Sequence, residues 1–233
     1  MARLPRLSVG GLPHLIVQRG FPAQPLFVDD DDRRLFLAKL AEAARAQHVA
    51  VHAYVLLDAE IQLLATPKDA SGIGRMMQSI GRAYVAAFNR RHGRSGTLWQ
   101  ARYRACVLEG EPFFIACMRY VEARPLHFGH VDAIDYPWSS AAHHVGRRAL
   151  PFITEHPMYW HLGNTPFERE AVYRSTLERA LTQHEIHQIE QAALKGWALG
   201  SDRFVHELGK HTDRRLRPLP RGRPARRHAA SAR

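Results

Sequence analysis

Short apolar runs predict four β-strands in the first half of the chain, and one of them also alternates, because side chains two residues apart on a strand share a face. The two clearest strands flank a tight turn at Asp58-Ala59, and the first strand ends at the Arg19-Gly20 step. A basic, aromatic segment leads into the last strand. The four strands are expected at residues 15–18, 49–57, 60–66 and 98–107.

Apolar residues at three- and four-residue spacing predict three helices between and after these strands. The first, at 31–47, follows an acidic cluster at 29–32, whose carboxylates suit the partial positive charge of a helix N-terminus. The second opens at Ser71-Gly72, and the third starts at Glu111-Pro112 and stops before Pro125. The order β-α-β-β-α-β-α predicts an α+β fold, a ferredoxin-like antiparallel sheet with helices on one face. The other face of the sheet is expected to stay free for a ligand.

The character of the sequence changes after Gly129. Residues rich in proline, histidine and aromatics without clear periodicity follow, and we expect ordered loops and short helices there. Further helices are predicted at 167–181, 184–199 and 202–208, and the last of these opens on Ser201 as its cap. Beyond Asp213 few apolar residues remain, so this end is expected to be disordered until it meets a partner. The expected organisation is a palm at 1–129, a loop-wrapped helical C-terminal region at 130–211 and a basic disordered tail at 212–233.

Charge narrows the choice of partner. The chain carries 33 Lys and Arg against 22 Asp and Glu, a formal net charge of +11. Such a surplus favours nucleic acid, since each phosphate contact releases condensed counterions. No stretch approaches the ~20 apolar residues of a spanning helix, so no membrane partner is expected and the protein should be cytoplasmic. The two cysteines, Cys106 and Cys117, show no Cys/His grouping at metal spacing, which argues against a disulfide scaffold or a zinc site.

The segment 88–104 mixes arginines with aromatic residues. Arginine neutralises phosphates and aromatic planes stack on unpaired bases, so this mixture predicts a groove that binds single-stranded nucleic acid. The alternative is an exposed loop anchored by a buried Trp99. The candidate nucleic-acid-binding residues in this segment are Arg90, Arg91, Arg94, Trp99, Arg102 and Arg104. Arg19, at the end of the first strand, is a further candidate.

A second basic motif lies near the C-terminus, where Arg221-Gly222-Arg223-Pro224 forms a short extended core. Such a core can enter a narrow A·T-rich minor groove, because the negative potential there attracts arginine and glycine lets the backbone approach closely. Alternatively, a basic tail of any order gives non-specific DNA affinity.

Three residues could carry chemistry. Glu60 and Gln62 point to one face of their strand, and Mg²⁺ commonly binds through one or two carboxylates plus waters and substrate phosphates. The same pair could be a solvated sheet face. Tyr120 lies on the helix before Pro125, where its hydroxyl could attack a phosphodiester. It could also be a core residue with its hydroxyl at the surface.

Taken together, these residues resemble the single-tyrosine HUH transposases, specifically the REP-associated tyrosine transposases of bacteria. The resemblance spans about residues 12–138, with further similarity through Arg221. It rests on ordered blocks: QRG at 18–20, HAYVL at 52–56, LLATP at 63–67, MMQS at 76–79, NRRHGRSG at 89–96, LWQ at 98–100, RYVE at 119–122 and DYPWSS at 135–140.

The resemblance implies a palm that binds single-stranded or hairpin DNA, two strand histidines that hold Mg²⁺ or Mn²⁺, and a helix-borne tyrosine that forms a 5′-phosphotyrosine link. Tyr120 matches that tyrosine. Glu60 and Gln62 stand where the family has its two histidines, and Arg124 stands where an asparagine is common. The resemblance therefore implies a protein of DNA transposition and recombination whose metal site is degenerate and whose cleavage is impaired. A domesticated, non-catalytic factor that recognises DNA hairpins or repeats and an RNA-binding protein are the alternatives.

Overall fold

A four-stranded antiparallel sheet forms the centre of the computed structural model, which describes residues 6–22, 24–129 and 132–218. The strands lie in the order β2-β3-β1-β4, and each neighbouring pair is antiparallel. This arrangement confirms the predicted α+β fold with an antiparallel sheet. The strands are β1 (His14–Arg19), β2 (Val49–Leu56), β3 (Glu60–Pro67) and β4 (Arg104–Val107).

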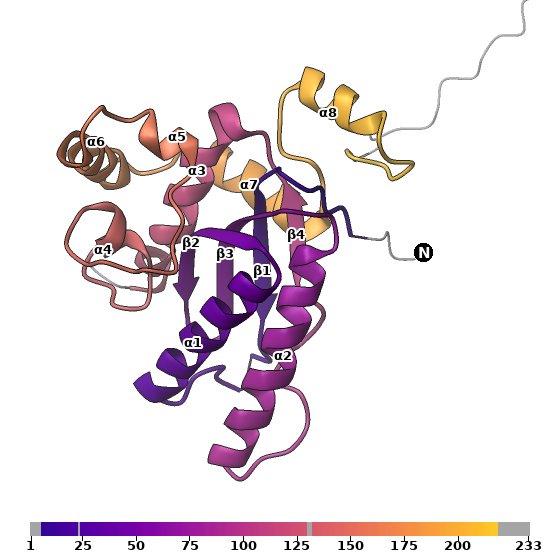
Figure 1. Cartoon of the computed structure of the whole chain (residues 1–233), viewed down its shortest axis with the longest axis vertical. Helices are drawn as coiled ribbons and strands as arrows, with labels where there is room; N and C mark the ends of the chain where they lie inside the picture. Colours follow the sequence, from indigo (N-terminus) through magenta and orange to yellow (C-terminus); the bar gives the residue numbers. More distant parts are fainter. Residues whose placement is uncertain (1–5, 23, 130–131, 219–233) are drawn as a thin grey trace, which may run out of the picture.

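Two long helices, α1 (Asp30–Ala46) and α2 (Gly72–Arg91), cover one face of this sheet, as expected (Figure 1). Asp29 caps α1 by accepting a hydrogen bond from the backbone N–H of Asp32. The apolar stripes of the two helices, which include Phe36 and Tyr84, pack on strand residues such as Leu63. Burial of these aromatic and aliphatic side chains supplies most of the force that holds this layer in place.

The opposite face of the sheet is also covered, so the expectation of a free face is wrong. Helices α3 (Gly110–Glu122) and α7 (Gln183–Lys195) pack against it (Figure 1). Most of the strand side chains on this face are apolar, and Leu15, Val55 and Leu64 among them are fully buried. Leaving them in water would forfeit the hydrophobic energy of a whole layer, which explains why the helices close over them.

Four further helices extend the layer around α3: η1 (Arg124–Phe128), α4 (Ala141–His144), α5 (Pro157–Trp160) and α6 (Pro166–Glu178). Helix α8 (Asp202–Gly209) lies apart from them, where its Leu208 packs with Leu7 and with Val107 of β4 (Figure 1). The predicted C-terminal helices are present as α6, α7 and α8, and Ser201 caps α8 as expected by accepting from the backbone N–H of Phe204. None of the helices in the described ranges is long and apolar enough to cross a membrane.

A buried carboxylate ties α3 to these later elements. Glu122 is fully buried and accepts hydrogen bonds from Ser140 Oγ at 2.5 Å, His144 Nδ1 at 2.7 Å and the Tyr173 hydroxyl at 2.6 Å. All three donors come from the C-terminal half of the chain. Because a buried charge needs such partners, this network fixes where α4 and α6 sit against α3.

The last strand is shorter than predicted, since only Arg104–Val107 of the expected 98–107 belongs to β4. Nearer the start of this segment, the Gln18 side-chain amide donates to the carbonyl of Ala101 at 3.0 Å. Trp99 pairs with Gly20 through an isolated bridge, and the backbone N–H of Gln100 donates to the carbonyl of Arg19 at 3.0 Å. Residues 101–103 lie outside the regular ladder and form part of the wall of a groove described below.

Candidate functional site

The structure brings Glu60, Gln62 and Tyr120 together on the face of the sheet beneath α3 and α7. Glu60 and Gln62 share the face of the buried Leu64, and in the antiparallel register Arg19 lies directly opposite Glu60. Tyr120, near the end of α3, interacts with both Glu60 and Gln62. The three residues that the sequence marked for chemistry thus form one cluster.

Two arginines neutralise the Glu60 carboxylate. Arg19 Nε donates to Glu60 Oε2 at 2.5 Å, and Arg124 Nε lies 3.5 Å from Glu60 Oε1. Gln62 Nε2 donates to the same Oε1 at 2.6 Å. The carboxylate is therefore surrounded by donors on both oxygens.

A second carboxylate reaches the cluster from α7. Glu190 Oε1 accepts hydrogen bonds from the Tyr120 hydroxyl and from Arg124 Nη1, each at 3.2 Å. With Arg19 and Glu60, the set contains two guanidinium groups and two carboxylates, so its charges cancel. The neutral cluster explains how so many charged groups can lie together beneath two helices.

The Tyr120 hydroxyl is held in its protonated form. The side chain is only 5% exposed, and burial raises the pKa of Tyr120 above its ordinary value. Arg124 and Gln62 oppose this rise, whereas Glu190 and Glu60 add to it. In this arrangement the hydroxyl is a weak nucleophile.

The residues present do not fit a metal ion. Within the described part of the chain, no group of three or more His, Cys, Asp or Glu side chains is placed to hold one. Gln62 Oε1 is buried without a hydrogen bond of ordinary geometry, yet it is a neutral ligand and both Glu60 oxygens already accept from other donors. A divalent cation would also meet repulsion from Arg19 and Arg124.

The histidines on β1 and β2 do not supply a metal site either. His14 and His52 are buried, and burial lowers the pKa of each to about 4. His14 interacts with the backbone of Leu12, and His52 with the carbonyl of Thr154. Both are neutral structural residues, and neither contributes to the Tyr120 cluster.

Four of the predicted nucleic-acid residues lie along one basic path. A groove of about 1100 Å³ between α2 and residues 96–103 is lined by Trp99 and Arg102, among others. Arg102 also lines a smaller cavity of about 330 Å³, together with Arg19, Arg104 and Lys195. Arg19 in turn binds Glu60 in the Tyr120 cluster. The basic path therefore leads from the groove to the tyrosine.

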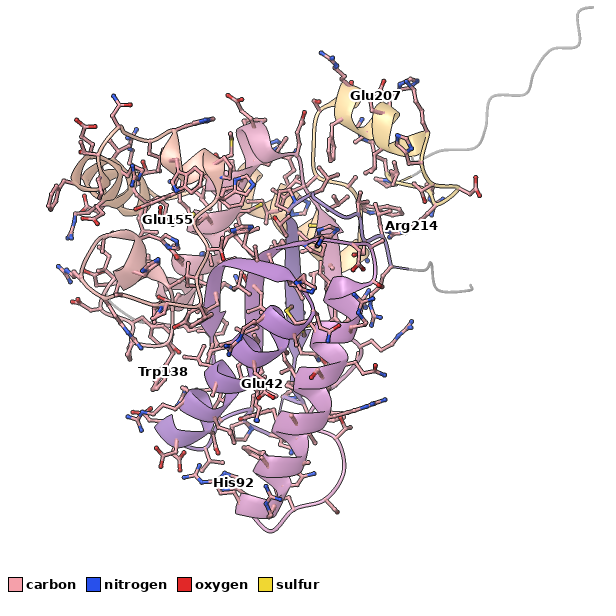
Figure 2. All side chains as sticks on the ribbon, in the orientation of Figure 1. Glu42, His92, Trp138, Glu155, Glu207 and Arg214 are labelled. Carbon is pink, nitrogen blue, oxygen red and sulfur yellow. The ribbon has the colours of Figure 1, made fainter. Side chains whose placement is uncertain are left out.

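The other predicted arginines lie elsewhere. Arg90, Arg91 and Arg94 sit at or just beyond the C-terminal end of α2, where Figure 2 labels His92. Arg91 is bound there by Asp29 and Asp32, and the guanidinium of Arg94 lies 5.7 Å from the centre of the Phe88 ring. The two tail arginines, Arg221 and Arg223, lie outside the described residues.

Sequence reasoning missed several residues of this site. Three of them, Arg6, Arg75 and Arg82, line the groove, and Lys195 lines the smaller cavity. Glu190 comes from a helix 130 positions after Glu60, and no local pattern marks it. Two glycines inside α2, Gly74 and Gly81, were an available signal, because glycine weakens a helix interior and needs a packing reason there.

Comparison with known proteins places the fold. Neither a protein-family model nor a curated protein matches the sequence. Among solved structures, a REP-associated tyrosine transposase bound to a REP hairpin aligns with a TM-score of 0.55 at 16% identity, covering 67% of this chain and 92% of that one. A candidate transposase from Deinococcus radiodurans R1 aligns with a TM-score of 0.36 at 17% identity, covering 52% and 92%. The first comparison shows that this chain has the fold of a REP-associated tyrosine transposase.

Proposed function

We propose that the protein is a DNA-binding factor built on a tyrosine-transposase palm, which holds hairpin or single-stranded DNA and does not cleave it efficiently. The fold is that of a transposase solved with a REP hairpin, and the basic path gives this chain its own means of holding phosphates. DNA is therefore the partner, and the same palm that cleaves in a transposase serves here for binding.

The observation that carries the loss of cleavage is the neutral cluster around Tyr120. Attack of the tyrosine oxygen on phosphorus needs a deprotonated hydroxyl and a cation that stabilises the pentavalent phosphorane. Here the hydroxyl donates to Glu190, and the positive charges of Arg19 and Arg124 are already matched by carboxylates. Mg²⁺ and Mn²⁺ have no place in this proposal, because the donor set does not fit them.

One observation favours a second candidate, cleavage without a metal. The Glu190 carboxylate lies 3.2 Å from the Tyr120 hydroxyl, close enough to accept its proton. Arg124, which contacts the same carboxylate, would then bind the attacked phosphate in place of a metal ion. This candidate needs Tyr120, which is only 5% exposed, to become accessible, whereas the side chain of Glu190 is already 33% exposed.

One experiment decides between the two. The protein is incubated with a labelled DNA hairpin carrying single-stranded flanks, in EDTA, Mg²⁺ or Mn²⁺, and covalent adducts are separated on a denaturing gel. We expect a gel-shift complex in all three conditions and no adduct in any of them. An adduct in EDTA that disappears in Tyr120→Phe would establish metal-free cleavage. An adduct that requires Mg²⁺ or Mn²⁺ would contradict the argument that the site cannot accept a metal.

The RNA alternative loses its main support, because it relied on a free sheet face and both faces are covered. Competition between matched DNA and RNA hairpins tests this point, and we expect DNA to win. The basic tail is proposed to add non-specific affinity through Arg221 and Arg223. A truncation after Pro218 tests it cleanly, because Leu216 is buried and must stay in place.

A further inference from the structure

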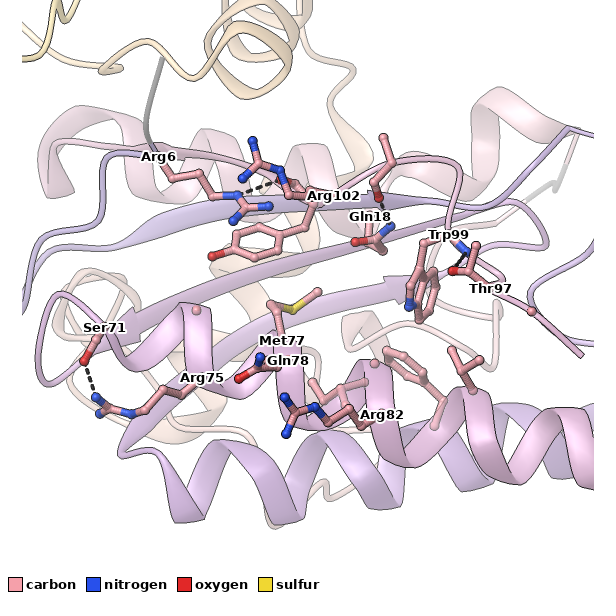
Figure 3. Close-up of a pocket in the computed structure, with 18 residues that line it drawn as sticks. Arg6, Gln18, Ser71, Arg75, Met77, Gln78, Arg82, Thr97, Trp99 and Arg102 are labelled. Atoms are coloured by element: carbon pink, nitrogen blue, oxygen red, sulfur yellow. Dashed lines mark hydrogen bonds between the residues drawn. The ribbon is translucent and has the colours of Figure 1, made fainter. Parts of the chain in front are cut away.

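A wide groove lies between α2 and the segment that leaves the sheet after Trp99 (Figure 3). Figure 3 shows Trp99 and Arg102 on one side and Gln78 and Arg82 of α2 on the other, with Arg6 and Arg75 toward one end. At about 1100 Å³ the groove exceeds what side-chain packing leaves between two elements, and its surface is mostly apolar.

Two glycines keep the floor of the groove open. Gly74 and Gly81 are seven residues apart on α2 and therefore share a face of the helix. A Cβ at Gly81 would lie 3.4 Å from Trp99 Nε1, and one at Gly74 would lie 3.8 Å from the Tyr103 hydroxyl. Larger side chains at these positions would fill the space in front of both aromatic rings. The glycines thus preserve an aromatic wall that faces a cavity.

The charged side chains that line the groove are all positive. Four arginines line the groove and no Asp or Glu does so. Arg82 and Arg102 are exposed, and neither forms a hydrogen bond or ion pair with another residue of the described chain. Arg6 stacks on Tyr103, with 3.8 Å between its guanidinium carbon and the ring centre. An apolar partner would gain nothing from these cations, whereas a phosphate backbone would neutralise them.

We propose that this groove holds unpaired nucleotides of a DNA strand, with bases against Trp99 and Tyr103 and phosphates on Arg82 and Arg102. The aromatic wall supplies the stacking surface that an unpaired base can use and a base inside a duplex cannot. Arg102 also lines the cavity that contains Arg19, so a strand leaving the groove is led toward the Tyr120 cluster. The inference rests on the proposed DNA-binding function and locates its single-strand site.

The test measures binding of a labelled twelve-nucleotide oligothymidine by fluorescence anisotropy over a range of salt concentrations. The double variant Arg82→Gln/Arg102→Gln should weaken binding at least tenfold and lower the slope of log K against log salt by about 1.4, because each single-strand phosphate that is no longer neutralised lowers it by about 0.7. Arg203→Gln is the matched control. Arg203 is an exposed arginine on α8, outside the groove, without a hydrogen bond or ion pair to described residues.

A second measurement tests whether bases contact Trp99 and Tyr103. It uses the unaltered protein, because Trp99 also packs near the Tyr84 ring and its replacement could unfold the protein. An oligothymidine carrying 5-iododeoxyuridine is photocrosslinked to the unaltered protein, and the attachment is mapped by mass spectrometry. Crosslinks at Trp99 or Tyr103 support the proposal. Crosslinks confined to other residues overturn it.

The DNA-binding function and the groove as its single-strand site fail differently. If the unaltered protein binds neither the oligothymidine nor a DNA hairpin, the proposed function itself is wrong. If it binds both and the Arg82→Gln/Arg102→Gln variant behaves like Arg203→Gln, DNA binding stands and the groove is not its single-strand site. Tighter binding of a matched oligouridine RNA would overturn the choice of DNA as the occupant.

Discussion

Replacing the buried Glu122 with alanine should be among the most destabilising substitutions in this protein. The carboxylate accepts hydrogen bonds from three side chains of the C-terminal half. In the alanine variant, the Tyr173 hydroxyl and His144 Nδ1 are left without these partners inside the protein. Ser140 Oγ is affected less, because it also lies 3.3 Å from the carbonyl of Tyr54 and 2.8 Å from its N–H.

The magnitude follows from these hydrogen bonds. A buried donor left without a partner costs about 1–3 kcal/mol, so two such donors give a loss of roughly 2–6 kcal/mol in the free energy of unfolding. For a chain of this size, that corresponds to a fall in Tm of roughly 4–24 °C. Glu122→Gln keeps an acceptor oxygen and adds an N–H that Tyr173 can accept, so it should cost only about 1–2 kcal/mol.

Urea unfolding followed by circular dichroism measures both variants. We expect lower midpoints with an unchanged m-value, since the surface exposed on unfolding stays the same. In a double-mutant cycle, Tyr173→Phe should cost clearly less in the Glu122→Ala background than alone, because its partner is already missing. A loss below about 1 kcal/mol for Glu122→Ala would refute the reasoning, because it would mean that the carboxylate is not an essential acceptor.

Two further predictions concern stability. Burial lowers the pKa of His14 and His52 to about 4, so the unfolded state binds more protons than the folded state between about pH 6.5 and pH 4. As the pH falls through that window, the free energy of unfolding should fall by up to about 3 kcal/mol per histidine. His52→Gln should reduce this pH dependence, whereas substitution of the exposed His127 by glutamine should not. Arg91→Gln should lower the free energy of unfolding by about 1–3 kcal/mol, because the fully buried Asp32 loses its guanidinium partner at 2.6 Å. The salt dependence of DNA binding should stay unchanged in this variant. A changed salt dependence with unchanged stability would show that Arg91 contacts DNA.

Local signals in the sequence predicted the elements well. The apolar run at 49–57 located β2, alternation at 60–66 located β3, and the acidic cluster at 29–32 located the start of α1. The error over the free sheet face had a visible cause. Residues 49–57 are apolar at almost every position, a pattern of strands buried on both sides, whereas a half-solvated strand alternates. Weighing that run more heavily would have predicted a second helical layer.

The site was predictable only in part. Alternation on β3 placed Glu60 and Gln62 on one face, and the resemblance brought Tyr120 into consideration. The contact between Arg19 and Glu60 depends on strand register, and the contact between Tyr120 and Glu190 depends on where α7 docks. Neither register nor docking is encoded in a local window, because both are decided by packing between segments far apart in the chain.

The paired charges around Glu60 also set how far the present sequence lies from a metal-binding one. Exchanging Glu60 and Gln62 for two histidines would leave Arg19 without the carboxylate it binds here, and would leave Arg124 with Glu190 alone. The imidazoles would then share their pocket with two guanidinium groups that repel a dication. A metal site is therefore several coordinated substitutions away, and replacing Glu60 first leaves two guanidinium groups with a single carboxylate.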